Sequence, residues 1–159
     1  MDVYEYAMKV EKDGEAYYRE LASKAMNTGL KNILVMLADA EVKHYKLFQN
    51  MKNHEAIAMT DLDVLSYVKN IFVIMKEEQQ FDLDLSEIAL YRKAQEIEKK
   101  MRDFYLEKAD EVDRSQREIF LKIANEEQRH YLILEDIINM VNRPASWIEN
   151  PEWYHLEEY

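Results

Sequence analysis

Apolar side chains recur every three or four residues along most of the chain, which is the spacing that places them on one face of an α-helix. The clearest such run consists of Phe120, Ile123, Glu127, His130, Leu134, Ile137 and Val141. Glu127 and His130 therefore occupy positions where a helix normally buries an apolar residue. An earlier run has the same form, with members Leu34, Leu37, Glu41, His44, Phe48 and Met51. Each run predicts an amphipathic helix with a carboxylate and an imidazole in its buried face.

The periodicity predicts four long helices, over approximately 2–26, 30–52, 86–110 and 115 to just before Pro144. The segment Asn27–Gly29 offers a C-cap and a turn after the first helix. Ser86 is the predicted cap of the third helix, and Ser115 to Glu118 matches a capping box for the fourth. The short link between the first two helices makes them antiparallel neighbours.

A shorter helix is predicted between the two helical pairs. Thr60 to Asp63 matches a capping box, and the helix continues through Ile71 to about Glu77. This piece fits a long crossover that carries the chain from one end of a bundle to the other. We therefore expect an all-α four-helix bundle at 1–142, made of two helical hairpins. The aromatic segment 143–159 is expected to pack as a tail on the bundle or on a partner.

Composition narrows the fold and the function classes. The chain has 159 residues, 48% apolar and 33% charged, with 2 Gly and 2 Pro, which leaves little turn chemistry for a sheet protein. The formal net charge of -11 disfavours nucleic acid as a partner. Absence of cysteine excludes disulfides, thiolate catalysis and cysteine-held metal sites. The first residues lack the basic start and apolar run of a signal peptide, and the longest strongly apolar run, Ile71–Met75, is too short to cross a bilayer. We expect a cytoplasmic protein with no membrane partner.

The chain contains an internal repeat. Val10-Glu11-Lys12 followed by Tyr17-Tyr18 recurs as Ile97-Glu98-Lys99 followed by Phe104-Tyr105. Leu37-Ala38 followed by Glu41 and His44-Tyr45 recurs as Ile123-Ala124 followed by Glu127 and His130-Tyr131. The recurring residues include the polar exceptions within the apolar stripes, which helical composition alone does not produce. Two similar hairpins related by a pseudo-twofold axis bring these exceptions to one place.

Four carboxylates and two imidazoles are thus predicted to converge: Glu11, Glu41, His44, Glu98, Glu127 and His130. One Glu from each of two helices and Glu-x-x-His from each of the other two is the ligand set of dimetal carboxylate bundles. Two divalent cations would balance the four carboxylates, and iron or manganese suits mixed carboxylate and imidazole ligation, with zinc a non-redox occupant. Glu15 is an alternative to Glu11, whereas Glu96 and Glu126 share faces with basic residues and are assigned to solvated surfaces. Tyr18 and Tyr105 are the candidate catalytic residues, placed where a phenol can hydrogen-bond a metal-bound carboxylate.

These motifs resemble those of the rubrerythrin branch of the ferritin-like superfamily, and the similarity spans all four long helices. The closing segment from Asn150 to Tyr159 also resembles the tails of small proteins in that branch. The resemblance implies a di-iron site, held by the six residues above with Tyr18 and Tyr105 as paired inner tyrosines, that reduces hydrogen peroxide or reacts with dioxygen by cycling between ferrous and ferric iron. Rubrerythrins proper append a rubredoxin domain, which this cysteine-free sequence does not contain, so an external electron-donor protein, rubredoxin-like or other, is expected. They also carry an additional glutamate one turn after the third-helix ligand, where this chain has Met101.

Three functions are compatible with the sequence. The leading hypothesis is a di-iron oxidoreductase that acts on peroxide or dioxygen, as a homodimer. A ferroxidase that stores or delivers iron is the first alternative, and it predicts many irons per subunit. A structural bundle with an inert metal site is the second, and it predicts no ferric absorption change when peroxide is added to the ferrous protein.

Overall fold

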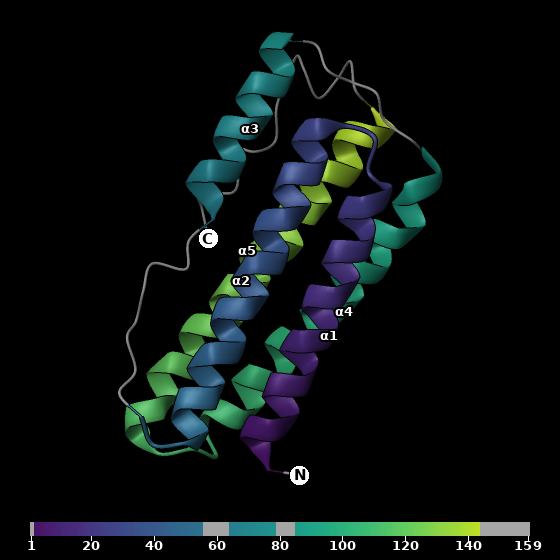
Figure 1. The fold of residues 1–159 in the computed structure, drawn as a ribbon. Coiled ribbons are helices and arrows are strands. Elements are labelled where there is room, and N and C mark those ends of the chain that lie inside the picture. Colours follow the sequence, from purple (N-terminus) through teal and green to yellow (C-terminus); the bar gives the residue numbers. More distant parts are fainter. Residues whose placement is uncertain (1, 56–63, 79–84, 144–159) are drawn as a thin grey trace.

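The structure is a computed structural model that describes residues 2–55, 64–78 and 85–143. Four long helices run side by side: α1 (Val3–Lys24), α2 (Thr28–Lys52), α4 (Ile88–Ala109) and α5 (Arg114–Asn142) (Figure 1). A shorter helix, α3 (Leu65–Glu78), lies against the outside of α2, and a 3-10 turn, η1 (Leu85–Glu87), leads into α4. The described residues contain no strand. The expected all-α ferritin-like four-helix bundle is confirmed.

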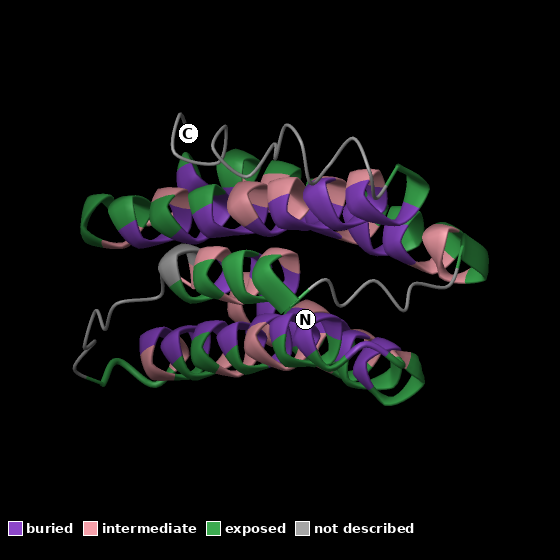
Figure 2. Cartoon of the chain, turned by 90° about the horizontal axis from the view of Figure 1, so that it is seen from above, coloured by how far each residue is buried: buried purple, intermediate pink, exposed green. Residues whose placement is uncertain are grey.

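The helices pack as two hairpins. α1 makes its most extensive contacts with α2, and α4 with α5, while α1 touches α4 and α2 touches α5 more sparsely. Buried residues line the inner faces of the helices and exposed residues the outer faces, as the sequence periodicity predicts (Figure 2). None of the helices in the described ranges is apolar over a length that could cross a bilayer.

The predicted helix ends need three corrections. Asn27 does not cap α1, which ends at Lys24 with Ala25 as its C-cap. The Oδ1 atom of Asn27 instead accepts a hydrogen bond from the Leu30 amide (3.1 Å) and caps the start of α2. Ser86 lies in the 3-10 turn, and Glu87 holds the N-cap position of α4. Ser115 lies inside the first turn of α5, because Asp113 is the N-cap and its carbonyl oxygen accepts from the Arg117 amide (3.0 Å). The capping box at Thr60 to Asp63 and the tail beyond residue 143 lie outside the described residues.

Gly29 allows α3 to approach α2 closely. A Cβ atom on Gly29 would lie 2.5 Å from Sδ and 2.7 Å from Cγ of Met75, which is far inside van der Waals contact. Met75, Phe72 and Val68 of α3 are buried in the same apolar cluster as Leu30 and Ile33 of α2. The short helix is therefore anchored to the bundle by its own apolar face.

The bundle core consists of two apolar clusters. One surrounds Leu34, Leu37 and Ile137, and the other surrounds Phe48, Phe120 and Met101. Along α2, α4 and α5, the residues of the predicted metal site lie between the positions that belong to the two clusters. The core is therefore interrupted at mid-height by a polar layer, which four helices position.

Candidate metal centre

Each of the four long helices contributes to the polar layer. α1 supplies Glu11 and α4 supplies Glu98. α2 and α5 each supply a Glu-x-x-His pair, Glu41 with His44 and Glu127 with His130. All six side chains are at most 1% exposed. Because a carboxylate removed from water costs several kcal/mol unless it is paired, such a layer requires positive charge close by.

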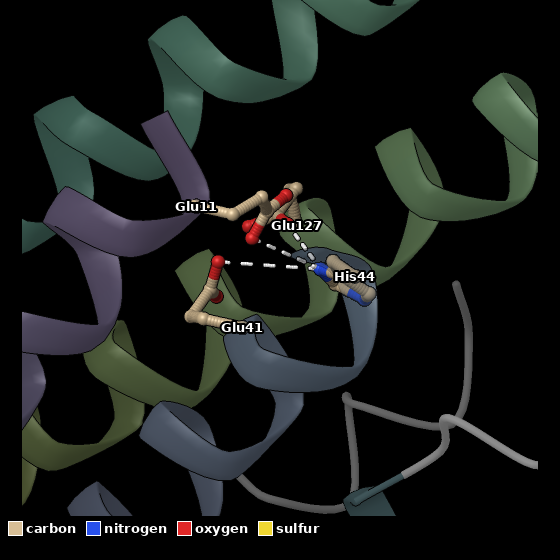
Figure 3. Close-up of side chains that lie close together, drawn as sticks. All are labelled: Glu11, Glu41, His44 and Glu127. Carbon is tan, nitrogen blue, oxygen red and sulfur yellow. Dashed lines mark ion pairs between the residues drawn. The ribbon is translucent and has the colours of Figure 1, made fainter. Parts of the chain in front are cut away.

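The first group of side chains surrounds His44. Its Nδ1 atom lies 2.9 Å from Oε1 of Glu127, 3.4 Å from Oε2 of Glu11 and 4.0 Å from Oε2 of Glu41 (Figure 3). These residues come from three helices and turn their polar ends toward one another. They offer one imidazole nitrogen and three carboxylate oxygens, all within 4.8 Å of one another.

The second group surrounds His130 in the same way. Its Nδ1 atom lies 3.1 Å from Oε1 of Glu41, 3.4 Å from Oε1 of Glu98 and 3.6 Å from Oε2 of Glu127. The two imidazole rings are nearly parallel, at an interplanar angle of 15°, with centroids 6.1 Å apart. The second group thus repeats the first about the pseudo-twofold axis that the sequence repeat predicts.

Glu41 and Glu127 belong to both groups. Each is the glutamate of a Glu-x-x-His pair, whereas Glu11 and Glu98 each belong to one group. Two shared and two unshared carboxylates with one imidazole on each side form a donor set for two adjacent cations. The buried Glu and His cluster therefore fits a metal site, and the assignment of the six residues as ligands stays a prediction.

The two inner tyrosines are paired across the bundle. The Tyr105 hydroxyl of α4 donates a hydrogen bond to Oε1 of Glu11 on α1 (2.7 Å), and the Tyr18 hydroxyl of α1 donates one to Oε1 of Glu98 on α4. The sequence places each tyrosine two turns from the glutamate on its own helix, and the structure shows that it binds the glutamate of the opposite helix. Each hairpin thereby orients a carboxylate of the other.

Burial raises the pKa of Glu11 well above its usual range, and the charges of Glu41 and Glu127 add to the effect. The pKa of Glu98 is raised for the same reasons, first by burial and then by Glu127 and Glu41. Burial alone would also raise the pKa of Glu127, but hydrogen bonds with Glu98, His130 and His44 outweigh it and lower that pKa. Glu11 and Glu98 therefore favour the protonated form, whereas Glu127, with its hydrogen-bond partners, favours the charged form. Carboxylates this close together cannot all be charged at once.

The imidazole of His130 and the phenols of Tyr18 and Tyr105 also favour their protonated forms. Burial opposes a charged His130, yet Glu98, Glu127 and Glu41 raise its pKa well above the ordinary value. Burial followed by the charge of Glu98 raises the pKa of Tyr18, and burial followed by Glu11 raises that of Tyr105. Both phenols therefore remain hydrogen-bond donors at neutral pH.

The donor chemistry of the layer fits a divalent metal ion such as iron. Within the described ranges, Oε2 of Glu11, Glu41 and Glu98 makes no hydrogen bond of ordinary geometry, although each atom is fully buried. Buried carboxylate oxygens without donors are the atoms that a cation would satisfy. Oxygen and imidazole ligands suit iron, manganese or zinc, and the donor types alone do not choose among these metals.

The neighbouring glutamates belong to neither group of candidate ligands, and the prediction for one of them, Glu126, needs a correction. Glu15, the alternative to Glu11, is a surface residue whose Oε2 lies 2.9 Å from Nη2 of Arg19. Glu96 is exposed, as expected. Glu126 is not on a solvated face: it is 3% exposed and its Oε1 lies 3.6 Å from Nη1 of Arg129. The prediction of a solvated face was therefore wrong for Glu126, because basic neighbours in the sequence carry no information on which helix face the rest of the chain covers.

Sequence reasoning missed the role of Gly14. A Cβ atom at this position would lie 3.5 Å from Oε2 of Glu41, an ordinary contact distance, so Gly14 leaves room for about one methyl group beside a carboxylate that both groups share. A glycine within a long helix costs about 1 kcal/mol of stability relative to alanine. The presence of a glycine in the middle of the first helix was therefore the signal in the sequence that could have drawn attention to this position.

Comparison with known proteins agrees with this geometry. A family model described as Rubrerythrin matches residues 2–138, which contain all six candidate ligands and both tyrosines. Searches of curated proteins and of solved structures gave no match.

Proposed function

The chain belongs to the rubrerythrin family, and from this premise we propose that it is a non-haem di-iron oxidoreductase that reduces hydrogen peroxide or dioxygen. The observation that carries the proposal is the pair of buried four-residue groups that share Glu41 and Glu127. Glu11 and His44 would complete the site for one iron, and Glu98 and His130 the site for the other. An external donor protein would return the electrons.

A ferrous pair would supply the two electrons that convert hydrogen peroxide and two protons into two molecules of water. The surrounding residues control where protons are held. Tyr18 and Tyr105 keep a proton on each phenolic oxygen and direct it at Glu98 and Glu11, which fixes the orientation of these two carboxylates. The apolar clusters on both sides of the layer exclude water from it.

The function is tested on protein purified without oxygen. Metal analysis should find about two irons per chain, as the donor set of a dimetal bundle requires. Titration of the ferrous protein with hydrogen peroxide should produce ferric absorption that saturates at about one peroxide for each iron pair. Bound metal with no spectral response to peroxide or dioxygen would favour the structural bundle.

The iron-handling alternative makes a different prediction in the same experiment. Storage requires many irons per subunit and a large shell-like assembly, whereas the oxidoreductase requires about two irons and a small assembly, proposed as a homodimer. Iron content measured after repeated additions of ferrous iron and oxidant therefore separates the two functions. We favour the enzyme because the buried donors account for two cations and form one closed layer.

A further inference from the structure

A groove lies between α1 and α4, where the two hairpins touch sparsely. Its volume is about 430 Å³ and its walls are mainly apolar, with Val10 of α1 and Ile97 and Phe104 of α4 among the lining residues. Small-molecule sites are typically clefts of about 300–1,000 Å³ with apolar walls, whereas a single water occupies about 30 Å³. The groove is therefore much larger than hydrogen peroxide or dioxygen needs.

The groove is built from the internal repeat. Every α1 residue in its lining has its repeat counterpart in the α4 lining, at the same offset that separates Glu11 from Glu98. Val10 corresponds in this way to Ile97, and Tyr17 to Phe104. The lining positions of the groove therefore obey the same pseudo-twofold relation as the metal layer, although several counterpart side chains differ.

Cross-helix contacts mark two places along the groove. The rings of Tyr6 and Phe104 pack with centroids 4.8 Å apart, and at the counterpart positions Nζ of Lys93 lies 5.8 Å from the ring centroid of Tyr17. Charged groups of both signs are exposed in the lining, with Asp13 on α1 and Lys100 on α4 at counterpart positions. Apolar walls with charges of opposite sign are complementary to a mostly uncharged organic molecule and not to an ion.

The buried part of the lining leads toward the metal layer. It contains Gly14 and Met101, which are also repeat counterparts and are both buried. Gly14 has no side chain, and the position of its missing Cβ lies 3.5 Å from Oε2 of Glu41. A ligand atom seated over Gly14 would thus come close to a carboxylate of the centre.

We propose that this groove binds an organic hydroperoxide, with its apolar body along Val10 and Ile97 and its O–O bond over Gly14. The inference rests on the proposed function and names a substrate class for it. In the reaction the O–O bond of ROOH breaks, two electrons from the ferrous pair and two protons are taken up, and ROH and water are released. The external donor then restores the ferrous state.

Direct binding is measured without turnover. The probe is cumyl alcohol, the unreactive counterpart of cumene hydroperoxide, added to zinc-loaded protein that carries ¹³C-methyl methionine. The methyl resonance of Met101, identified with Met101→Leu, should shift in a saturable way. Ile97→Trp, which fills the groove, should abolish the shift. An unchanged Met101 resonance in the wild-type protein would overturn the proposal.

Reaction kinetics test the substrate class. Ferrous protein is mixed with cumene hydroperoxide or with hydrogen peroxide, and ferric absorption is followed in stopped flow. Ile97→Trp should slow oxidation by cumene hydroperoxide at least about tenfold and leave the rate with hydrogen peroxide within about twofold, since only the larger substrate needs the groove.

Val42→Trp is the matched control. Val42 is also half-buried and adjacent to a candidate ligand, Glu41, but it lines a separate pocket of about 180 Å³ between α1 and α2 that also contains Glu11. It should leave both rates within about twofold of wild type. If iron oxidation by cumene hydroperoxide were slower in Val42→Trp and not in Ile97→Trp, the substrate would enter through the pocket at Val42, and the groove proposal would be overturned. If hydrogen peroxide oxidised the iron of the wild-type protein and cumene hydroperoxide did not, only the groove proposal would be overturned. If neither peroxide oxidised the iron, the proposed function would be overturned as well.

Discussion

The two hairpins are nearly alike in the metal layer and unlike in the groove. In the layer, Glu11 and Glu98 have the same environment, and each accepts a hydrogen bond from a tyrosine of the opposite helix. In the groove, counterpart positions carry Gly14 on α1 and Met101 on α4. The layer retains its repeat where four helices must supply matching donors. The groove diverges where each side chain meets a different neighbour.

This difference separates two kinds of constraint. A dinuclear donor set requires matched residues from both halves, because each cation needs its own imidazole and carboxylates. A groove that binds an asymmetric organic molecule has no such requirement, and one wall can offer space where the other offers a side chain. Equal effects of counterpart substitutions are therefore expected in the layer, and unequal effects in the groove.

The largest effect is expected from the shared carboxylates. Glu41→Ala and Glu127→Ala should each lower iron affinity by more than the roughly 10- to 100-fold that loss of an outer hydrogen-bond partner costs, because each removes an oxygen donor from both groups. The increase of melting temperature on adding metal should shrink in parallel, since that increase reflects metal bound to the folded state. Metal analysis and thermal unfolding with and without Fe²⁺ measure both. His130→Ala should act in the same direction.

Glu15→Ala is the matched control, because Glu15 lies on α1 one turn from Glu11 and pairs with Arg19 at the surface. It should leave iron content unchanged. Iron loading that survives Glu41→Ala or Glu127→Ala, or that is lost in Glu15→Ala, would contradict the ligand assignment. A large difference between Glu41→Ala and Glu127→Ala would contradict the equivalence of the halves.

Much of this layer could be predicted from the sequence because its residues break the apolar stripes. Glu127 and His130 stand out against Ile123 and Leu134, and the repeat selects Glu11 over Glu15. Helix periodicity fixes the direction of a side chain relative to its own helix. The fold class and the convergence of the six residues follow from that information.

Contacts between helices could not be predicted in the same way. The sequence placed Tyr18 near the glutamate of its own helix, and only the packing of α1 on α4 shows that its partner is Glu98. The burial of Glu126 likewise depends on what covers its face of α5. The second helix starts at Thr28 instead of about Leu30, and the fourth starts at Arg114 with Asp113 as its cap instead of at Ser115. Several nearby polar groups can serve as caps, and the backbone selects among them.

Proton release should accompany metal binding. Burial and the charges of Glu41 and Glu127 raise the pKa of Glu11, and burial with Glu127 and Glu41 raises that of Glu98, so both carry protons in the absence of metal. A cation must displace these protons, and its affinity should therefore rise as pH rises, by up to about tenfold per pH unit for each proton released. Zinc titration in weakly buffered solution with a pH indicator measures the release.

Glu11→Gln and Glu98→Gln test whether the halves contribute equally. Each variant removes one protonated carboxyl group, so each should reduce the proton release by a comparable amount. Proton release that does not change in either variant would show that other groups carry the protons. A decrease in only one variant would show that the two halves of the layer are not equivalent.

A smaller effect is expected from the tyrosines. Tyr18→Phe and Tyr105→Phe remove one hydrogen bond to Glu98 or Glu11 and leave every candidate ligand in place. Iron content should stay near wild type, while the absorption spectrum of the ferric protein and the rate of its formation change, because the carboxylate loses the donor that orients it. Metal analysis and stopped-flow absorption measure these properties. Complete loss of iron from either variant would assign its tyrosine a direct role in holding metal.

The smallest effect is expected at Gly14, where the two hairpins differ most in side-chain size. Alanine fits there, because its Cβ would lie 3.5 Å from Oε2 of Glu41, an ordinary contact distance. Gly14→Ala should therefore raise the free energy of unfolding by about 0.8–1 kcal/mol, the difference in helix propensity between the two residues. Ala16→Gly, at an exposed position of the same helix, should lower it by a similar amount and calibrates the measurement. Denaturant unfolding without metal provides both values. If Gly14→Ala were destabilising, the space beside Glu41 would already be filled in the folded protein, and the groove could not deliver a ligand atom to that position.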